Sequence, residues 1–73
     1  MSYKIYIKEN FITIGKLIKK TGFTQTGGAS KYFLKNNKIL INNQIPQGRN
    51  TKVFNGDIVW INDNVFMIQT KEN

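Results

Sequence analysis

The chain has 73 residues, a formal net charge of +7, and neither Cys nor His. A chain this short buries only about 60% of the surface that it exposes when unfolded, so we expect a single domain with a small core. The missing Cys and His exclude disulfides and the usual zinc sites, and no apolar run approaches the roughly 20 residues that cross a bilayer. We therefore expect a cytoplasmic protein without metal, cofactor or membrane partner.

The first part of the chain predicts a strand and then a helix. Residues 3–8 alternate between two faces and are rich in β-branched and aromatic side chains, which is typical of a strand. Thr13 is a suitable N-cap for a following helix, and Gly22 is a suitable left-handed stop. Between them, apolar residues recur at helical spacing and form one stripe: Ile14, Leu17 and Ile18.

A second helix is expected from about Gly28 to Asn36. Its buried face is predicted to hold three residues at helical spacing, Ser30, Phe33 and Leu34. Asn37 follows it and can adopt the left-handed conformation that often ends a helix. Two short helices joined by a link that contains glycine are expected to pack as an αα-hairpin.

From Lys38 the apolar period changes to two, which predicts strands near 39–41, 58–61 and 65–68. Asn42-Asn43 is a good type I′ turn pair, after which Gln44-Ile45 is expected to begin a return strand. Residues 46–50 are expected to form a loop. A strand, two helices and then several strands predict an α+β fold.

Four segments resemble, in order and spacing, the RNA-binding domain first seen in small-subunit ribosomal protein four: residues 14–18, 26–34, 39–43 and 55–59. The similarity is greatest to stand-alone YaaA/YbcJ-type members, which carry a Ser-Gly-Gly element where this chain has Thr26-Gly27-Gly28. The resemblance implies an αL-type helix pair packed on a small, mostly antiparallel twisted sheet, with RNA held across the helices and adjoining loops. It also implies a role in translation, such as ribosome maturation.

On this resemblance, residues 1–73 form one RNA-binding domain with a core motif at 14–61. The flanking strands, 3–8 and 65–68, lie outside that motif and are expected to extend the sheet by pairing with each other or with 59–61. Many family members open the second helix with a Ser-Arg pair. Thr26-Gly27 stands there in this chain, so backbone N–H groups are expected to replace an Arg contact.

The charge is unevenly distributed along the chain. Residues 10–56 contain no acidic residue, and all four acids lie outside that stretch: Glu9, Asp57, Asp63 and Glu72. The same stretch holds eight basic residues: Lys16, Lys19, Lys20, Lys31, Lys35, Lys38, Arg49 and Lys52. This segregation favours binding of a polyanion. The alternative is codon drift toward Lys and Asn, which adds Lys but does not readily segregate every acid.

Two rows of lysines form the candidate phosphate-binding face. The first helix carries Lys16, Lys19 and Lys20, and the second carries Lys31 and Lys35. If the helices pack through their apolar stripes, both rows flank one groove. The alternative is two ordinary solvated helix faces. Lys38 and Lys52 are secondary candidates.

Three further sites have competing interpretations. Thr26-Gly27-Gly28 either presents backbone N–H groups to a phosphate at a helix N-terminus or only permits a tight turn. Arg49, in an exposed loop, can grip a phosphate or a guanine edge, which Lys cannot do bidentately. Tyr32 is placed to stack on a base, because Ser30, Phe33 and Leu34 use the buried face, or else it covers the edge of the core, which is the interpretation we prefer.

The sequence lacks the parts of an enzyme. There is no His, no Cys and no cluster of carboxylates, so general acid–base, nucleophilic and metal chemistry are all unsupported, and no small-molecule substrate is expected. Together with the family resemblance, which implies RNA and ribosomal RNA in particular, this predicts a monomeric, non-catalytic protein that recognises structured RNA. The alternatives are an adaptor that binds an acidic protein and a protein that binds duplex DNA.

Overall fold

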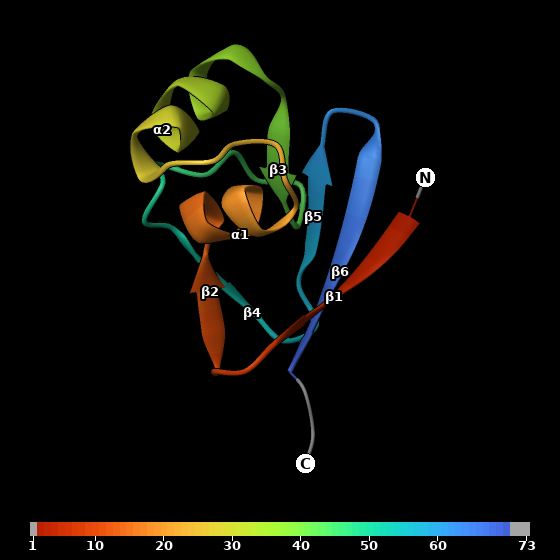
Figure 1. Ribbon diagram of the computed structural model, residues 1–73. Coiled ribbons are helices and arrows are strands. Elements are labelled where there is room, and N and C mark those ends of the chain that lie inside the picture. The colour runs from red at the N-terminus through yellow and green to blue at the C-terminus, as the bar shows by residue number, and fades with distance from the viewer. Residues whose placement is uncertain (1, 71–73) are drawn as a thin grey trace.

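The computed structural model describes residues 2–70. Along this part of the chain the elements are β1 Ser2–Ile7, β2 Phe11–Thr13, α1 Ile14–Lys20, α2 Gly27–Asn36, β3 Ile39–Ile41, β4 Lys52–Phe54, β5 Ile58–Ile61 and β6 Asn64–Thr70. The two helices lie together beside β3 and β5, while β1 and β6 run on the side away from them (Figure 1). This arrangement confirms the expected α+β fold.

The main sheet has four strands in the order β1-β6-β5-β3. Strand β1 pairs with β6 in parallel, whereas β6 with β5 and β5 with β3 are antiparallel. The two flanking strands therefore pair with each other, and β6 also pairs with β5, as expected from the sequence. A second sheet of two antiparallel strands, β2 and β4, lies below α1 (Figure 1).

Apolar side chains from both helices and both sheets meet in one core. The buried members are Ile7, Ile14, Leu17, Ile18, Ile39, Val53, Val59, Ile61, Phe66 and Ile68. The predicted stripe of the first helix is fully buried, and Phe33 and Leu34 of α2 pack against the core from its edge. The core thus fixes the two helices relative to the sheet, and with them the side chains that point to solvent.

The helix ends follow the local signals in the sequence. The hydroxyl oxygens of Thr13 and Thr26 accept hydrogen bonds from the N–H groups of Lys16 and Ala29, at 3.4 and 3.1 Å. Gly22 has a φ of 91° just after α1. Its N–H donates to the carbonyl of Lys19, and the next N–H, from Phe23, donates to Ile18. Such a pair of bonds closes a Schellman motif, so α1 ends where predicted.

The expectation for Asn37 was wrong. Its backbone is extended, with a φ of −134°, and the left-handed conformation is not used. Its side-chain amide donates instead to the carbonyl of Phe33, at 3.0 Å, and its amide oxygen accepts from the side chain of Asn62, at 3.1 Å. The side chain therefore satisfies the end of the helix, and the backbone is free to continue straight into β3.

The predicted return strand after the Asn42-Asn43 turn does not form. Both asparagines have positive φ, as the type I′ turn requires, but pairing stops after one bridge, between Ile41 and Gln44. Pro46 cannot donate the N–H of a further rung, and β3 pairs with β5 instead. Strands β2 and β4 were not expected from the sequence: each has three residues and pairs with a partner that is far away along the chain.

Within residues 2–70 no helix is both long enough and apolar enough to cross a membrane.

Candidate nucleic-acid interface

The loop of residues 48–51 is held against the first turn of α1 by its backbone. The N–H of Ile14 donates to the carbonyl of Thr51 at 2.8 Å, and the N–H of Gly15 donates to the carbonyl of Arg49 at 2.9 Å. A Cβ atom on Gly15 would lie only 3.0 Å from that carbonyl oxygen and 3.1 Å from the Cβ of Arg49. Glycine at this position therefore permits the close approach that places Arg49 beside α1.

The same glycine also ties α2 to α1. Ser30 is fully buried, and its hydroxyl lies 3.1 Å from the carbonyl oxygen of Gly15 and 3.1 Å from the hydroxyl of Thr24. One peptide segment of α1 thus contacts both the loop and the second helix. The sequence carried a signal for both residues: a glycine in the first turn of a helix, and a small polar residue on an apolar helix face.

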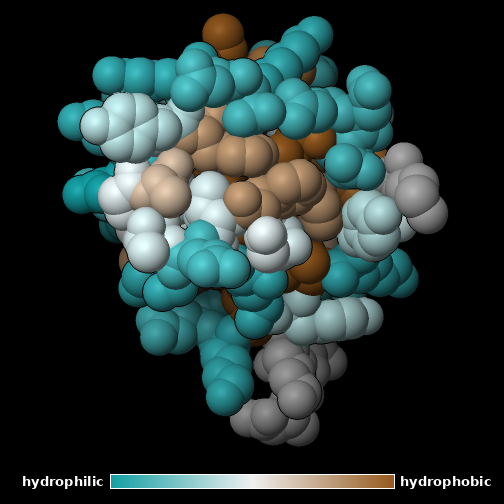
Figure 2. Space-filling view, turned by 45° about the horizontal axis from the view of Figure 1, so that its top comes forward, coloured by the Kyte–Doolittle hydropathy of each residue, from teal (hydrophilic) through white to brown (hydrophobic). Residues whose placement is uncertain are grey.

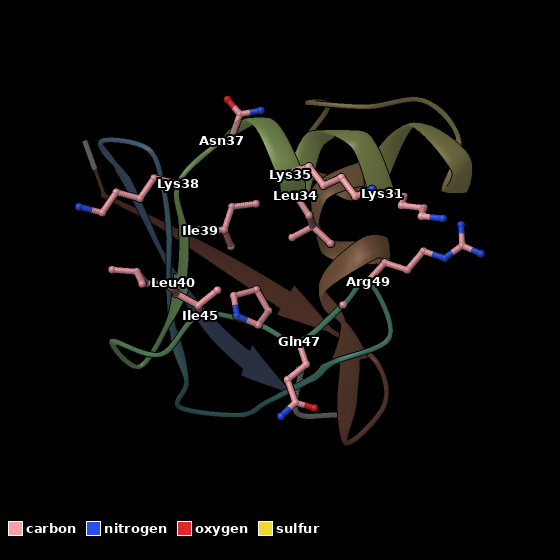
Figure 3. Close-up of a pocket in the computed structure, with 12 residues that line it drawn as sticks. Lys31, Leu34, Lys35, Asn37, Lys38, Ile39, Leu40, Ile45, Gln47 and Arg49 are labelled. Carbon is pink, nitrogen blue, oxygen red and sulfur yellow. The ribbon is translucent and has the colours of Figure 1, made fainter.

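A pocket of about 380 Å³ lies between α2, β3 and the loop after β3. We call it the helix–loop pocket. It is lined by Lys31, Leu34, Lys35, Asn37, Lys38, Ile39, Leu40, Ile45, Pro46, Gln47, Gly48 and Arg49, among which there is no acid. Figure 3 shows Arg49 and Lys31 at one end and Lys38 at the other, with apolar side chains between them.

A second, shallower hollow adjoins the same loop. Its lining includes Lys16 and Lys19 of α1 together with Arg49, again without an acid. Arg49 therefore belongs to both hollows and connects the basic residues of the two helices. We call the set of six side chains the cationic surface: Lys16, Lys19, Lys31, Lys35, Lys38 and Arg49. These are the sequence-predicted residues that the fold brings together.

Two predicted lysines line neither of the two hollows that Arg49 borders. Lys20 lines a different hollow that also contains Lys8 and Glu9, so an acid lies close to it. The ammonium of Lys52 lies over the ring of Phe11, 4.7 Å from its centroid, in a cation–π contact on the β2–β4 sheet. Lys16 lines this hollow as well as the one beside Arg49, so the row of lysines on α1 spans both hollows, with Lys19 on the Arg49 side and Lys20 on the Glu9 side.

Tyr32 and the start of α2 remain separate from both hollows of the cationic surface. Tyr32 is 67% exposed, so the interpretation that it covers the core was wrong. The face of α2 toward the core is formed by Ser30, Phe33 and Leu34. Gly28 is exposed, and a Cβ added to it would meet nothing within 4 Å. The turn between the helices therefore does not require glycine at position 28.

An exposed apolar area was not anticipated from the sequence. Figure 2 shows hydrophobic residues at the centre of one face, bordered by hydrophilic ones. Two exposed aromatic residues, Tyr3 and Phe23, contact the buried ring of Phe66 at 5.1 and 6.3 Å, and Phe23 also meets Phe33 at 5.3 Å. The signal was present only as scattered aromatic residues, far apart in the sequence.

The carboxylate of Asp57 stabilises a turn. One carboxylate oxygen of Asp57 accepts from the N–H of Phe54 at 2.8 Å, and the other accepts from the side-chain amide of Asn42 at 2.9 Å. This confirms the expected role of Asp57 in hydrogen-bonding a turn. Among the residues that the structure describes, no group of three His, Cys, Asp or Glu side chains is placed to hold a metal ion.

Comparison with known proteins gives two matches that cover most of the chain. The family model of the S4 domain matches residues 5–69. A protein of Bacillus subtilis (strain 168) described as "Probable ribosome maturation protein RlbA" is 34% identical over 61 residues, which cover 84% of this chain and 86% of that protein.

Proposed function

The chain belongs to the S4 domain family, and we propose that it is a non-catalytic RNA-binding protein that acts in ribosome maturation. The similarity to a relative named as a probable ribosome maturation protein supports the second part of the proposal. The RNA would be structured, ribosomal RNA in particular, and it would be held by the helix pair together with the loop of residues 48–51. The protein would act as a monomer and a single domain.

The cationic surface is the observation that carries this proposal. Two adjoining hollows, whose linings contain no acid, are bordered by six basic side chains. These side chains come from the two helices, from Lys38 just before β3, and from the loop that contains Arg49. Such a field attracts phosphates at several points and fixes the orientation of an RNA backbone without reading its sequence. The backbone contacts of Gly15 hold the loop against α1, so much of this arrangement exists before RNA binds.

We propose a phosphate contact at the start of α2 as an extension of the same surface. The hydroxyl of Thr26 accepts a hydrogen bond from the N–H of Ala29, and Gly28, in the same first turn, is exposed to solvent. Helix N-termini with open N–H groups attract anions. Lys31, one turn further along α2, adds charge on the way to the helix–loop pocket. Lys52 and Lys20 would contribute less, and the exposed ring of Tyr32 would be available to stack on a base.

The test is a comparison of ligands across a salt series. We expect ribosomal RNA fragments to bind more tightly than duplex DNA of the same length or heparin. If three to five phosphates are neutralised, log K against log salt should fall with a slope of roughly −2 to −4. A flat salt dependence would contradict the electrostatic mechanism. Equal binding of all three ligands would reject recognition of RNA shape, and preference for duplex DNA would favour that rival function.

The proposed step in ribosome maturation is tested in cells. We expect the tagged protein to co-sediment with a ribosomal subunit or its precursor at low salt, and to be released as salt is raised. Suppose that the purified protein binds RNA but the tagged protein co-sediments with no ribosomal particle. The RNA-binding function would then stand, and the ribosomal role would be rejected.

A further inference from the structure

We propose that the helix–loop pocket receives a single unstacked nucleobase, so that this protein recognises RNA with an unpaired or bulged nucleotide. This inference rests on the proposed RNA-binding function and goes beyond it, because contact with phosphates alone does not distinguish a bulge from a continuous helix.

The size and the walls of the pocket suit a flat, largely apolar group. Its volume, about 380 Å³, lies at the lower end of the range of roughly 300–1,000 Å³ that small-molecule sites span. Five of the side chains that line it are apolar: Leu34, Ile39, Leu40, Ile45 and Pro46. In Figure 3 Leu34, Ile39 and Ile45 lie between the charged ends. A base that left its stack would exchange water for these side chains on its faces.

The charge at the rim suits the two phosphates that flank a base. Arg49 and Lys31 lie at one end of the pocket and Lys38 at the other (Figure 3). A nucleotide within a strand carries a phosphate on each side of its sugar, so cations at both ends match it. An isolated apolar ligand would gain nothing from this rim. Because the lining contains no acid, no local repulsion opposes the approach of the backbone.

The outer wall of the pocket is prearranged. Ile45 is 80% exposed, an unusual position for a large aliphatic side chain. It follows a turn closed by two backbone bonds between Ile41 and Gln44, at 2.7 and 2.9 Å, and precedes the rigid Pro46. Next to them Gln47 also lines the pocket, and its side-chain amide carries both a donor and an acceptor. Little ordering is therefore left to occur on binding.

The experiment uses the full chain and two RNA hairpins that differ only in one bulged 2-aminopurine. We expect the bulged hairpin to bind about tenfold more tightly than the fully paired one, with a change in 2-aminopurine fluorescence as the base leaves its neighbours. The variant Ile45→Ser should remove most of that preference and leave the affinity for the paired hairpin unchanged. The matched control is Ile58→Ser, a partly exposed isoleucine in a separate hollow on the sheet.

The outcomes separate this inference from the proposed function. If neither hairpin binds, the RNA-binding function fails. If both bind equally and Ile45→Ser changes neither, the function stands and the base pocket is wrong. If an acidic peptide that contains leucine competes with the bulged hairpin and itself depends on Ile45, the pocket serves a protein and the inference is overturned. Circular dichroism melting of both variants shows whether any loss is caused by unfolding.

Discussion

The two helices begin alike, yet their first turns have different environments. Each follows a threonine N-cap, and each has glycine as its second residue: Gly15 in α1 and Gly28 in α2. The first turn of α1 is covered by the loop of residues 48–51, whose carbonyl oxygens accept hydrogen bonds from the N–H groups of Ile14 and Gly15. The first turn of α2 is open at Gly28. One local signal can therefore serve either a backbone contact within the fold or a surface free to meet a ligand.

The largest expected effect tests whether the cationic surface joins the two helices in one site. Replacing Lys19 and Lys31 together with Ala should weaken RNA binding by about 1–3 kcal/mol in total, because each helix loses a phosphate contact. The fold should be unaffected, since both side chains are exposed. Fluorescence anisotropy with a labelled ribosomal RNA fragment measures the affinity.

The control for that double variant replaces Lys4 and Lys71 with Ala and removes the same charge. Lys4 is exposed on β1, away from the cationic surface, and Lys71 lies outside the residues that the structure describes. Equal losses of affinity in the two double variants would mean that only net charge matters, and the proposed site would be wrong. Unfolding of the Lys19/Lys31 variant would mean that those residues are structural.

The next largest effect is a loss of stability expected from a change at Gly15, in the first turn of α1, which the loop of residues 48–51 covers. In Gly15→Ala the new methyl group would press on the carbonyl of Arg49, so the loop must shift. Crowding of this kind costs about 1–3 kcal/mol, and the better helix propensity of Ala offsets part of it. We expect the free energy of unfolding in urea to fall by about 1–2 kcal/mol. A variant as stable as the original chain would show that the loop yields easily.

The same change at the open helix start should have the opposite sign. Gly28→Ala meets no neighbouring atom, so it should raise the free energy of unfolding by about 0.5–1 kcal/mol. If the N–H groups there hold a phosphate, RNA affinity should nevertheless fall, because the methyl group hinders close approach. Higher stability with unchanged affinity would remove Thr26, Gly27 and Gly28 from the site.

The smallest effect is expected at Lys20. It shares its hollow with Glu9, and it lies apart from Arg49. Lys20→Ala should reduce RNA affinity by less than about 0.5 kcal/mol, clearly less than Lys19→Ala in the same titration. Equal losses for the two adjacent lysines would indicate that RNA covers α1 on both sides, and the boundary of the cationic surface would need to be moved.

Structural features that depend only on residues close together in the chain could be predicted from the sequence. The caps at Thr13 and Thr26 and the stop at Gly22 depend on side chains within one turn, and all three occur in the structure. The buried stripe of α1 follows from periodicity. The lysines were named, but not their grouping: helical spacing placed Lys19 and Lys20 in one row, and only the docked loop shows that Arg49 lies beside the first of them.

Features that depend on distant backbone could not be predicted. The loop of residues 48–51 is held by hydrogen bonds to its backbone carbonyl oxygens. Every residue type has such a carbonyl, so the amino-acid sequence does not reveal this contact. Strands β2 and β4 are three residues each and depend on one another across most of the chain. Asn37 was misjudged because its side chain has a partner, Asn62, that only the folded sheet brings near. The helix–loop pocket combines side chains of α2, β3 and the following loop, which only the folded chain brings together.

The parallel pairing of β1 with β6 has a consequence for synthesis. The register pairs residue 2 with residue 65 and residue 7 with residue 70, so β1 cannot pair until β6 has been synthesised. Contacts between residues so far apart close slowly, because the entropy of the intervening segment must be lost first. Until β6 leaves the ribosome, the apolar residues of β1, Ile5 and Ile7, lack their cover, and the nascent chain is most prone to aggregate in that interval.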